Sequence, residues 1–218
     1  MTIRVLVAED QAAVRAALVM IVGSAPDIEV VGEAADGEEA VRLALALRPD
    51  VVLMDIQMPR LDGVGATRAI VAEDAAQVLV LTTFDLDEYV FGALRAGAAG
   101  FLLKDADADS LIEGIRTVAR GDGALAPSVT RRLISSVARP GRTDTAEARA
   151  AVSALTGRER EVLVCLGEGL SNSLIADRLG MAEATTKTHV SRILAKLSLS
   201  SRVQAAVLAQ ELGIVPGR

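Results

Sequence analysis

The sequence predicts an α/β domain with a doubly wound, five-stranded parallel sheet, followed by an all-α domain of four helices. Short apolar runs of β-type residues alternate five times with longer amphipathic stretches over the first ~120 of the 218 residues. Beyond residue 152 only helical patterns remain. The net charge is −11 over residues 1–123, +3 over 124–151 and +2 over 152–218. These observations predict two domains, of which only the second is suited to bind a polyanion.

Each predicted strand is a short apolar run, and each is followed by a predicted helix. The strands are expected at 3–8, 28–33, 51–54, 78–81 and 99–103. The helices are expected near 11–22, 38–47, 64–73, 86–96 and 108–119. The first, third and fourth strands are almost wholly apolar, as expected where helices cover both faces of a sheet. Prolines and polar residues over 124–151 predict a linker with a short helix near 128–138.

The second domain is predicted to be a helix-turn-helix domain. Thr156 and Glu159 have the spacing of a capping box at the start of its first helix. Two short helices around a tight turn then precede a longer helix over 183–197. The outward face of that helix carries Lys187, Thr188 and Ser191, flanked by His189 and Arg192. Such side chains can bond DNA bases and phosphates, and a plain solvated face is the alternative.

Composition excludes several classes of protein. Aromatic residues make up 2% of the chain, which argues against proteins that stack bases on aromatic side chains. Cys165 and His189 are the only residues of their types, so a disulfide scaffold and a multi-histidine metal site are excluded. No apolar run approaches the roughly 18 residues of a membrane span, and the N-terminus does not resemble a signal peptide. We expect a cytoplasmic protein.

Side chains with useful chemistry follow four of the five strands. Glu9 and Asp10 follow the first, Asp55 the third, Thr82 the fourth and Lys104 the fifth. Parallel strands end at the same edge of a sheet, and strands one and three are neighbours in the order 2-1-3-4-5. We therefore expect the three carboxylates to converge, with Thr82 and Lys104 on the far side.

This constellation is suited to moving a phosphoryl group onto a carboxylate. Three close carboxylates repel one another, and Mg²⁺ relieves the repulsion. Lys104 and the Thr82 hydroxyl supply the cation and the donor that a phosphoryl group needs. Asp55 is the best acceptor because it is central. A flavin site lacks its Ser/Thr/Gly-rich loop, and an Asp-x-Asp phosphatase would need an acid where Gln57 stands.

The first part of the chain resembles the receiver domains of two-component response regulators. The resemblance rests on residues 8–10, 53–63, 81–85 and 96–105. It implies a flavodoxin-like fold with Asp55 as the acceptor of a phosphoryl group from a histidine kinase. It also implies that Mg²⁺ is held by Glu9, Asp10, Asp55 and the main-chain carbonyl of Gln57. By the same resemblance, Thr82 and Lys104 contact the phosphoryl group, and Phe101 is the aromatic switch residue or a plain core residue.

The last part resembles the DNA-binding domain of the NarL/FixJ (LuxR-type) family. The resemblance rests on residues 155–163, 169–172, 175–176, 185–190 and 196–197. It implies four helices, of which the third enters the major groove of double-stranded DNA and the last pairs two subunits. The DNA contacts would be Lys187, Thr188, His189, Ser191 and Arg192. The chain departs from the family at Leu174, Ala182 and Thr186, which replace a usual Glu, capping Ser and Val.

The sequence as a whole predicts a transcription factor switched by phosphorylation. Residues 1–123 would be the receiver domain, 124–151 the linker and 152–218 the LuxR-type helix-turn-helix domain. The phosphorylated homodimer would bind an operator, with RNA polymerase as a further partner, and enzymatic turnover would be limited to slow self-dephosphorylation. Two alternatives remain. The receiver is never phosphorylated and responds to dimerisation or a ligand, or the helical domain binds a protein in place of DNA.

Overall fold

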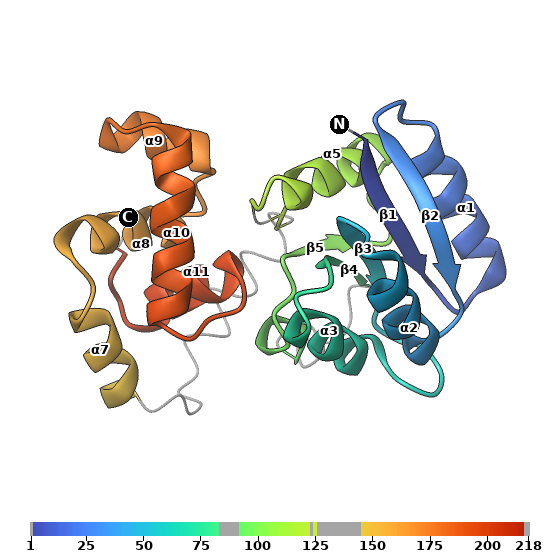
Figure 1. Cartoon of the computed structure of the whole chain (residues 1–218), viewed down its shortest axis with the longest axis horizontal. Coiled ribbons are helices and arrows are strands. Elements are labelled where there is room, and N and C mark those ends of the chain that lie inside the picture. The colour runs from blue at the N-terminus through green and yellow to red at the C-terminus, as the bar shows by residue number, and fades with distance from the viewer. Residues whose placement is uncertain (1, 83–91, 123, 126–144, 216–218) are drawn as a thin grey trace. The chain divides into compact units, whose positions relative to one another are not determined.

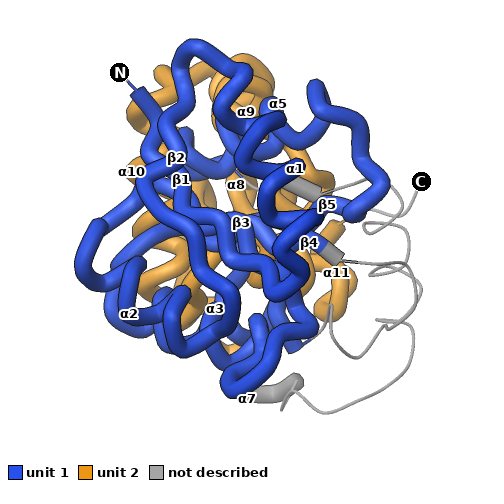
Figure 2. Tube along the Cα trace, turned by 90° about the vertical axis from the view of Figure 1, so that its right-hand side faces the viewer, with its two compact units in different colours: residues 1–126 blue, residues 127–218 orange. Residues whose placement is uncertain are grey.

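The chain folds into two compact units. The computed structural model describes residues 2–82, 92–122, 124–125 and 145–215. Residues 1–126 form one unit and residues 127–218 the other (Figure 2). Each unit has its own hydrophobic core. Across the described ranges, no helix combines the length and the apolar character that a membrane span requires.

The first unit contains a parallel sheet in the order β2-β1-β3-β4-β5-β6. Its first five strands are β1 Ile3–Ala8, β2 Ile28–Ala34, β3 Val51–Asp55, β4 Gln77–Thr82 and β5 Gly100–Leu103. The predicted fold class and the order 2-1-3-4-5 are therefore confirmed. The prediction of five strands is corrected by β6, Ala124–Leu125, which pairs in parallel with β5 and lies inside the predicted linker.

Helices cover both faces of this sheet (Figure 1). They are α1 Ala12–Gly23, α2 Gly37–Leu47, α3 Gly63–Ala72 and α5 Ala108–Ala119. α1 and α5 pack against each other, as do α2 and α3. A helical turn at 92–95 is the described part of the helix predicted near 86–96. The helix predicted near 128–138 lies outside the described residues.

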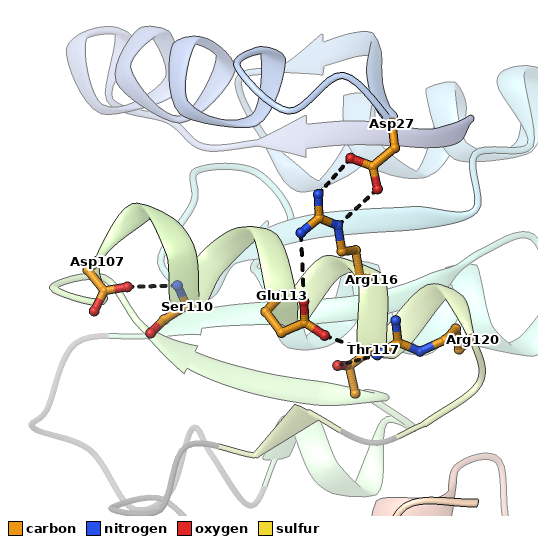
Figure 3. Close-up of polar contacts among 7 residues, drawn as sticks. All are labelled: Asp27, Asp107, Ser110, Glu113, Arg116, Thr117 and Arg120. Carbon is orange, nitrogen blue, oxygen red and sulfur yellow. Dashed lines mark hydrogen bonds and ion pairs between the residues drawn. The ribbon is translucent and has the colours of Figure 1, made fainter. Parts of the chain in front are cut away.

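A polar cluster ties α5 to the connection between α1 and β2 (Figure 3). The guanidinium of Arg116 donates to both carboxylate oxygens of Asp27, at 2.9 and 2.7 Å. Glu113 links Arg116 to Arg120 on the same helix. At the start of α5, the Asp107 carboxylate accepts a hydrogen bond of 2.7 Å from the Ser110 N–H. The Arg116–Asp27 contact holds the second half of α5 at the edge of the sheet where the strands begin, opposite the predicted site.

The loop that follows β3 turns back sharply on the strand. The Gly63 N–H donates to the Ile56 carbonyl at 2.8 Å. A Cβ on residue 63 would lie 2.0 Å from the carbonyl oxygen of Asp55, so only glycine fits there. The buried strand β3 and the tight loop that follows it therefore fix the backbone at Asp55.

In the second unit, the regular elements of the described residues 145–215 are all helices. Its members are α7 Thr145–Ser153, α8 Gly157–Gly167, α9 Asn172–Leu179, α10 Glu183–Lys196 and α11 Arg202–Glu211. The four predicted helices correspond to α8 to α11, and α7 lies at the end of the predicted linker. The predicted capping box is present: Thr156 and Glu159 each bond the other's backbone N–H. Ser171 caps α9 by accepting from the Leu174 N–H.

Candidate functional site

The first unit brings four of the predicted site residues together at the carboxyl ends of its strands. Glu9 follows β1, Asp55 ends β3 and Lys104 follows β5. The Lys104 Nζ lies 3.0 Å from Oε2 of Glu9 and 2.9 Å from Oδ1 of Asp55. Glu9 is fully buried, Asp55 is 4% exposed and Asp10 is exposed. The Asp10 carboxylate is thus accessible to solvent, whereas those of Glu9 and Asp55 are buried.

Burial shapes the charge of this cluster. It raises the pKa of Glu9, and the nearby Asp55 carboxylate adds to the effect, while the hydrogen bond from Lys104 opposes it. Burial alone would lower the pKa of Lys104. Hydrogen bonds to Asp55 and Glu9 outweigh that effect, and the pKa of Lys104 is raised. Lys104 therefore remains a cation between the two buried carboxyl groups.

The residues present fit a hard divalent cation. A carboxylate oxygen from each of Glu9, Asp10 and Asp55 lies within 4.8 Å of the other two. Oxygen donors of this kind are those that Mg²⁺ prefers, and the exposed Asp10 leaves one side open to water or a phosphoryl oxygen. Gln57, whose main-chain carbonyl is the predicted fourth ligand, is exposed in the loop after β3.

The predicted switch residues lie on the neighbouring strands. Thr82 ends β4 and pairs with Leu103 of β5, but its side chain lies outside the described residues. Phe101 of β5 pairs with Val80 and is fully buried. Thr82 is thus on the strand next to Asp55, and Phe101 is on the strand that leads to Lys104.

Arg15, which the sequence did not single out, also belongs to the site. Its Nη1 donates to the Glu9 carbonyl at 2.7 Å and lies 3.5 Å from the Asp10 carbonyl. Its Nε lies 3.4 Å from the Glu33 carboxylate. A cation in the first turn of a helix opposes the helix dipole. A basic residue at this position of a predicted helix is the sequence feature that could have identified Arg15.

The second unit exposes most of the predicted DNA contacts on α10. Lys187, Thr188, Ser191 and Arg192 are exposed, and His189 is half-buried. The opposite stripe packs into the core: Thr186, Val190 and Ile193 are buried. This is the amphipathic division that the sequence predicted for the helix.

The three departures from the family have local consequences. Ala182 begins α10 without a side chain that can cap it. Thr186 is fully buried, and its hydroxyl donates to the Ala182 carbonyl at 3.4 Å. Leu174 is 53% exposed on α9. Of the three, Thr186 thus has a hydrogen-bond partner for the polar group it buries.

Glu159 joins the start of α8 to the end of α10. Its carboxylate accepts from the Lys196 Nζ, at 2.9 and 2.7 Å, and from the Thr156 N–H at 2.8 Å. These bonds, with Lys196 the largest contributor, lower the pKa of Glu159 to about 2. The ion pair holds the exposed face of α10 in a defined orientation relative to α8.

Removing the lysine of the first unit should leave two buried carboxylates without their cation. We expect Lys104→Met to lower the free energy of unfolding by about 3 kcal/mol when no divalent ion is present. Added Mg²⁺ should restore more stability to this variant than to wild type, because it replaces the missing charge. Urea unfolding followed by circular dichroism measures both effects. Lys187→Met, which removes an exposed partner of Glu183, is the control, and equal losses in the two variants would contradict the expectation.

Acid should weaken the second unit through Glu159. The carboxyl is protonated near its ordinary pKa of 4.5 when unfolded but only near about 2 when folded. The unfolded state therefore binds more protons between these values, and the free energy of unfolding should fall as the pH falls from 4.5 to about 2. Urea unfolding across this range should show a shallower fall in Glu159→Gln. Equal pH slopes in the variant and wild type would rule out this linkage.

Comparisons with known proteins agree with this arrangement. Residues 5–116 match the response regulator receiver domain, and residues 153–209 match the bacterial regulatory proteins of the luxR family. The uncharacterized transcriptional regulatory protein YxjL of Bacillus subtilis (strain 168) is 43% identical over 214 residues, which cover 98% of this chain and 97% of YxjL. The nitrate/nitrite response regulator protein NarL of Escherichia coli (strain K12) is 36% identical over 204 residues, 93% of each chain.

A solved structure matches nearly the whole chain. The response regulator ChrA of a heme-sensing two-component system has a TM-score of 0.56 and 37% identity, and the match covers 98% of this chain and 99% of ChrA. The two matched family ranges fall one in each compact unit. The chain therefore belongs to the response regulators that join a receiver domain to a LuxR-type DNA-binding domain.

Proposed function

We propose that a partner histidine kinase phosphorylates Asp55 and that this modification controls dimerisation and operator binding. The observation that carries the proposal is the position of Asp55. Its carboxylate lies 2.9 Å from the Lys104 ammonium and shares its strand edge with Glu9 and Asp10. A carboxylate with a fixed cation on one side and a cation site on the other is suited to accept an anionic group.

The two oxygens of Asp55 have different surroundings. Oδ1 accepts from the Ile56 N–H at 2.7 Å and from Lys104 at 2.9 Å. Oδ2 is therefore the oxygen that would form the new bond to phosphorus, while the phosphorus–nitrogen bond of the kinase phosphohistidine breaks. The imidazole leaves with that electron pair.

Lys104 and the cation site would both neutralise negative charge in this transfer. Lys104 would donate to an oxygen of the incoming phosphoryl group while Asp55 keeps its bond from Ile56. Glu9, Asp10, Asp55 and the Gln57 carbonyl would hold Mg²⁺, which neutralises charge on the phosphoryl oxygens when bound. The Thr82 hydroxyl would supply a further donor from the end of β4.

The proposed switch runs along the two strands beside Asp55. Thr82 would move toward the phosphoryl group, and Phe101 would take up the space released within the sheet. Both lie in the β4–β5 pair. The altered surface there would favour pairing of two chains. Pairing places two α10 helices on neighbouring half-sites and raises DNA affinity through effective concentration.

The experiment uses the full chain with a small phosphodonor and Mg²⁺. Light scattering reports assembly, and fluorescence anisotropy reports binding to duplexes selected by the phosphorylated protein from a random library. We expect wild type to dimerise and bind, Asp55→Asn to do neither, and Lys187→Gln to dimerise but bind DNA more weakly, with a smaller salt dependence.

The other outcomes identify the alternatives. An Asp55→Asn protein that assembles and binds as wild type does would contradict the proposal and favour a receiver controlled without phosphorylation. DNA binding with no salt dependence in any variant would favour a helical domain that binds protein.

A further inference from the structure

Arg15 is placed where helix electrostatics disfavours it. It lies in the first turn of α1, which begins at Ala12. The N-terminal end of a helix carries partial positive charge, so a cation there is unfavourable. Local rules that a sequence breaks without a local gain mark strained or functional positions. Arg15 must therefore gain from contacts outside its own helix.

Those interactions are with the backbone of the cation site. Helical side chains lean toward the N-terminus, so Arg15 reaches the residues that precede the helix. Its Nη1 donates to the Glu9 carbonyl at 2.7 Å, with the Asp10 carbonyl at 3.5 Å. Only 19% of its side chain is exposed. One guanidinium thus contacts the two consecutive residues whose carboxylates would hold the cation.

The other side of the guanidinium is anchored on β2. Its Nε lies 3.4 Å from the carboxylate of Glu33, and β2 itself continues to Ala34, whose carbonyl accepts from the Glu9 N–H at 3.0 Å. Glu9 is therefore held at its N–H by β2, at its carbonyl by Arg15 and at its carboxylate by Lys104. β2 contributes no carboxylate to the predicted site, but its contacts help to fix Glu9 and Asp10, which contribute two.

We propose that Arg15 is a positioning residue for the divalent cation, holding Glu9 and Asp10 in the arrangement that binds it. This inference rests on the proposed function, because it assumes that the acidic cluster binds Mg²⁺. Arg15 would act through the main chain of two ligands and would contact neither the cation nor the phosphoryl group.

The charge of Arg15 and its positioning role predict opposite results. A nearby positive charge repels a divalent cation, so its removal would tighten cation binding if charge alone mattered. A group that orients ligands strengthens binding, and the loss of such outer contacts weakens metal affinity by about 10- to 100-fold. The sign of the change in affinity therefore separates the two roles.

The first measurement is Mn²⁺ binding to the full chain, followed by the electron paramagnetic resonance signal of free Mn²⁺. We expect Arg15→Met to raise the dissociation constant by about tenfold. Arg15→Lys keeps the charge but has no planar fork to join Glu33 to the carbonyls, so it should also bind more weakly than wild type. Arg42→Met is the matched control, because Arg42 is 66% exposed and pairs with Glu39 on α2.

An Arg15→Met affinity equal to or tighter than wild type would overturn the positioning role. Failure of wild type to bind Mn²⁺ would overturn the proposed cation site as well, so the two failures are distinct. A second readout separates positioning from general stability. The Mg²⁺ concentration that half-saturates phosphorylation should rise about tenfold, while the limiting rate and the cation-free melting temperature stay near those of wild type. A fall in limiting rate at unchanged half-saturation would also overturn the proposal.

Discussion

The site of the receiver unit depends on one lysine, Lys104, which offsets the repulsion between two buried carboxylates at the edge of the sheet. Glu9 is fully buried and Asp55 is 4% exposed, so neither has enough water to screen its charge. The ammonium of Lys104 contacts both. This three-way contact requires β1, β3 and β5 to end together, which a parallel sheet in the observed order provides. The remaining negative charge makes the site suited to a divalent cation, and that cation together with Lys104 would suit it to an incoming phosphoryl group.

A similar contact organises the helical unit. Glu159 is 3% exposed and bonds both the first turn of α8 and Lys196 at the end of α10. The helix that presents Lys187 and Arg192 to solvent is therefore fixed by a buried acid. In each unit, one glutamate and one lysine join elements that are distant in the sequence. In the receiver this pairing supports the proposed phosphoryl chemistry, and in the helical unit it orients the proposed DNA-binding face.

The sequence allowed prediction of those site residues whose positions depend on where the strands end. Glu9, Asp55 and Lys104 could be placed because residues that follow parallel strands meet at one edge. The outward face of α10 followed from helical spacing in the same way. The contacts of Arg15 with Glu33 on β2 and of Lys196 with Glu159 on α8 were missed because they arise from tertiary packing. β6 was missed because two residues carry no period.

The role proposed for Asp55 is that it accepts a phosphoryl group in a cation-dependent reaction. The most direct measurement is the intact mass of the chain after incubation with a small phosphodonor, with and without Mg²⁺. Borohydride reduction and peptide mass analysis then locate the modified residue. We expect one added phosphoryl group, on Asp55, formed only when Mg²⁺ is present. Modification of a different residue, equal modification without Mg²⁺, or none at all would contradict it.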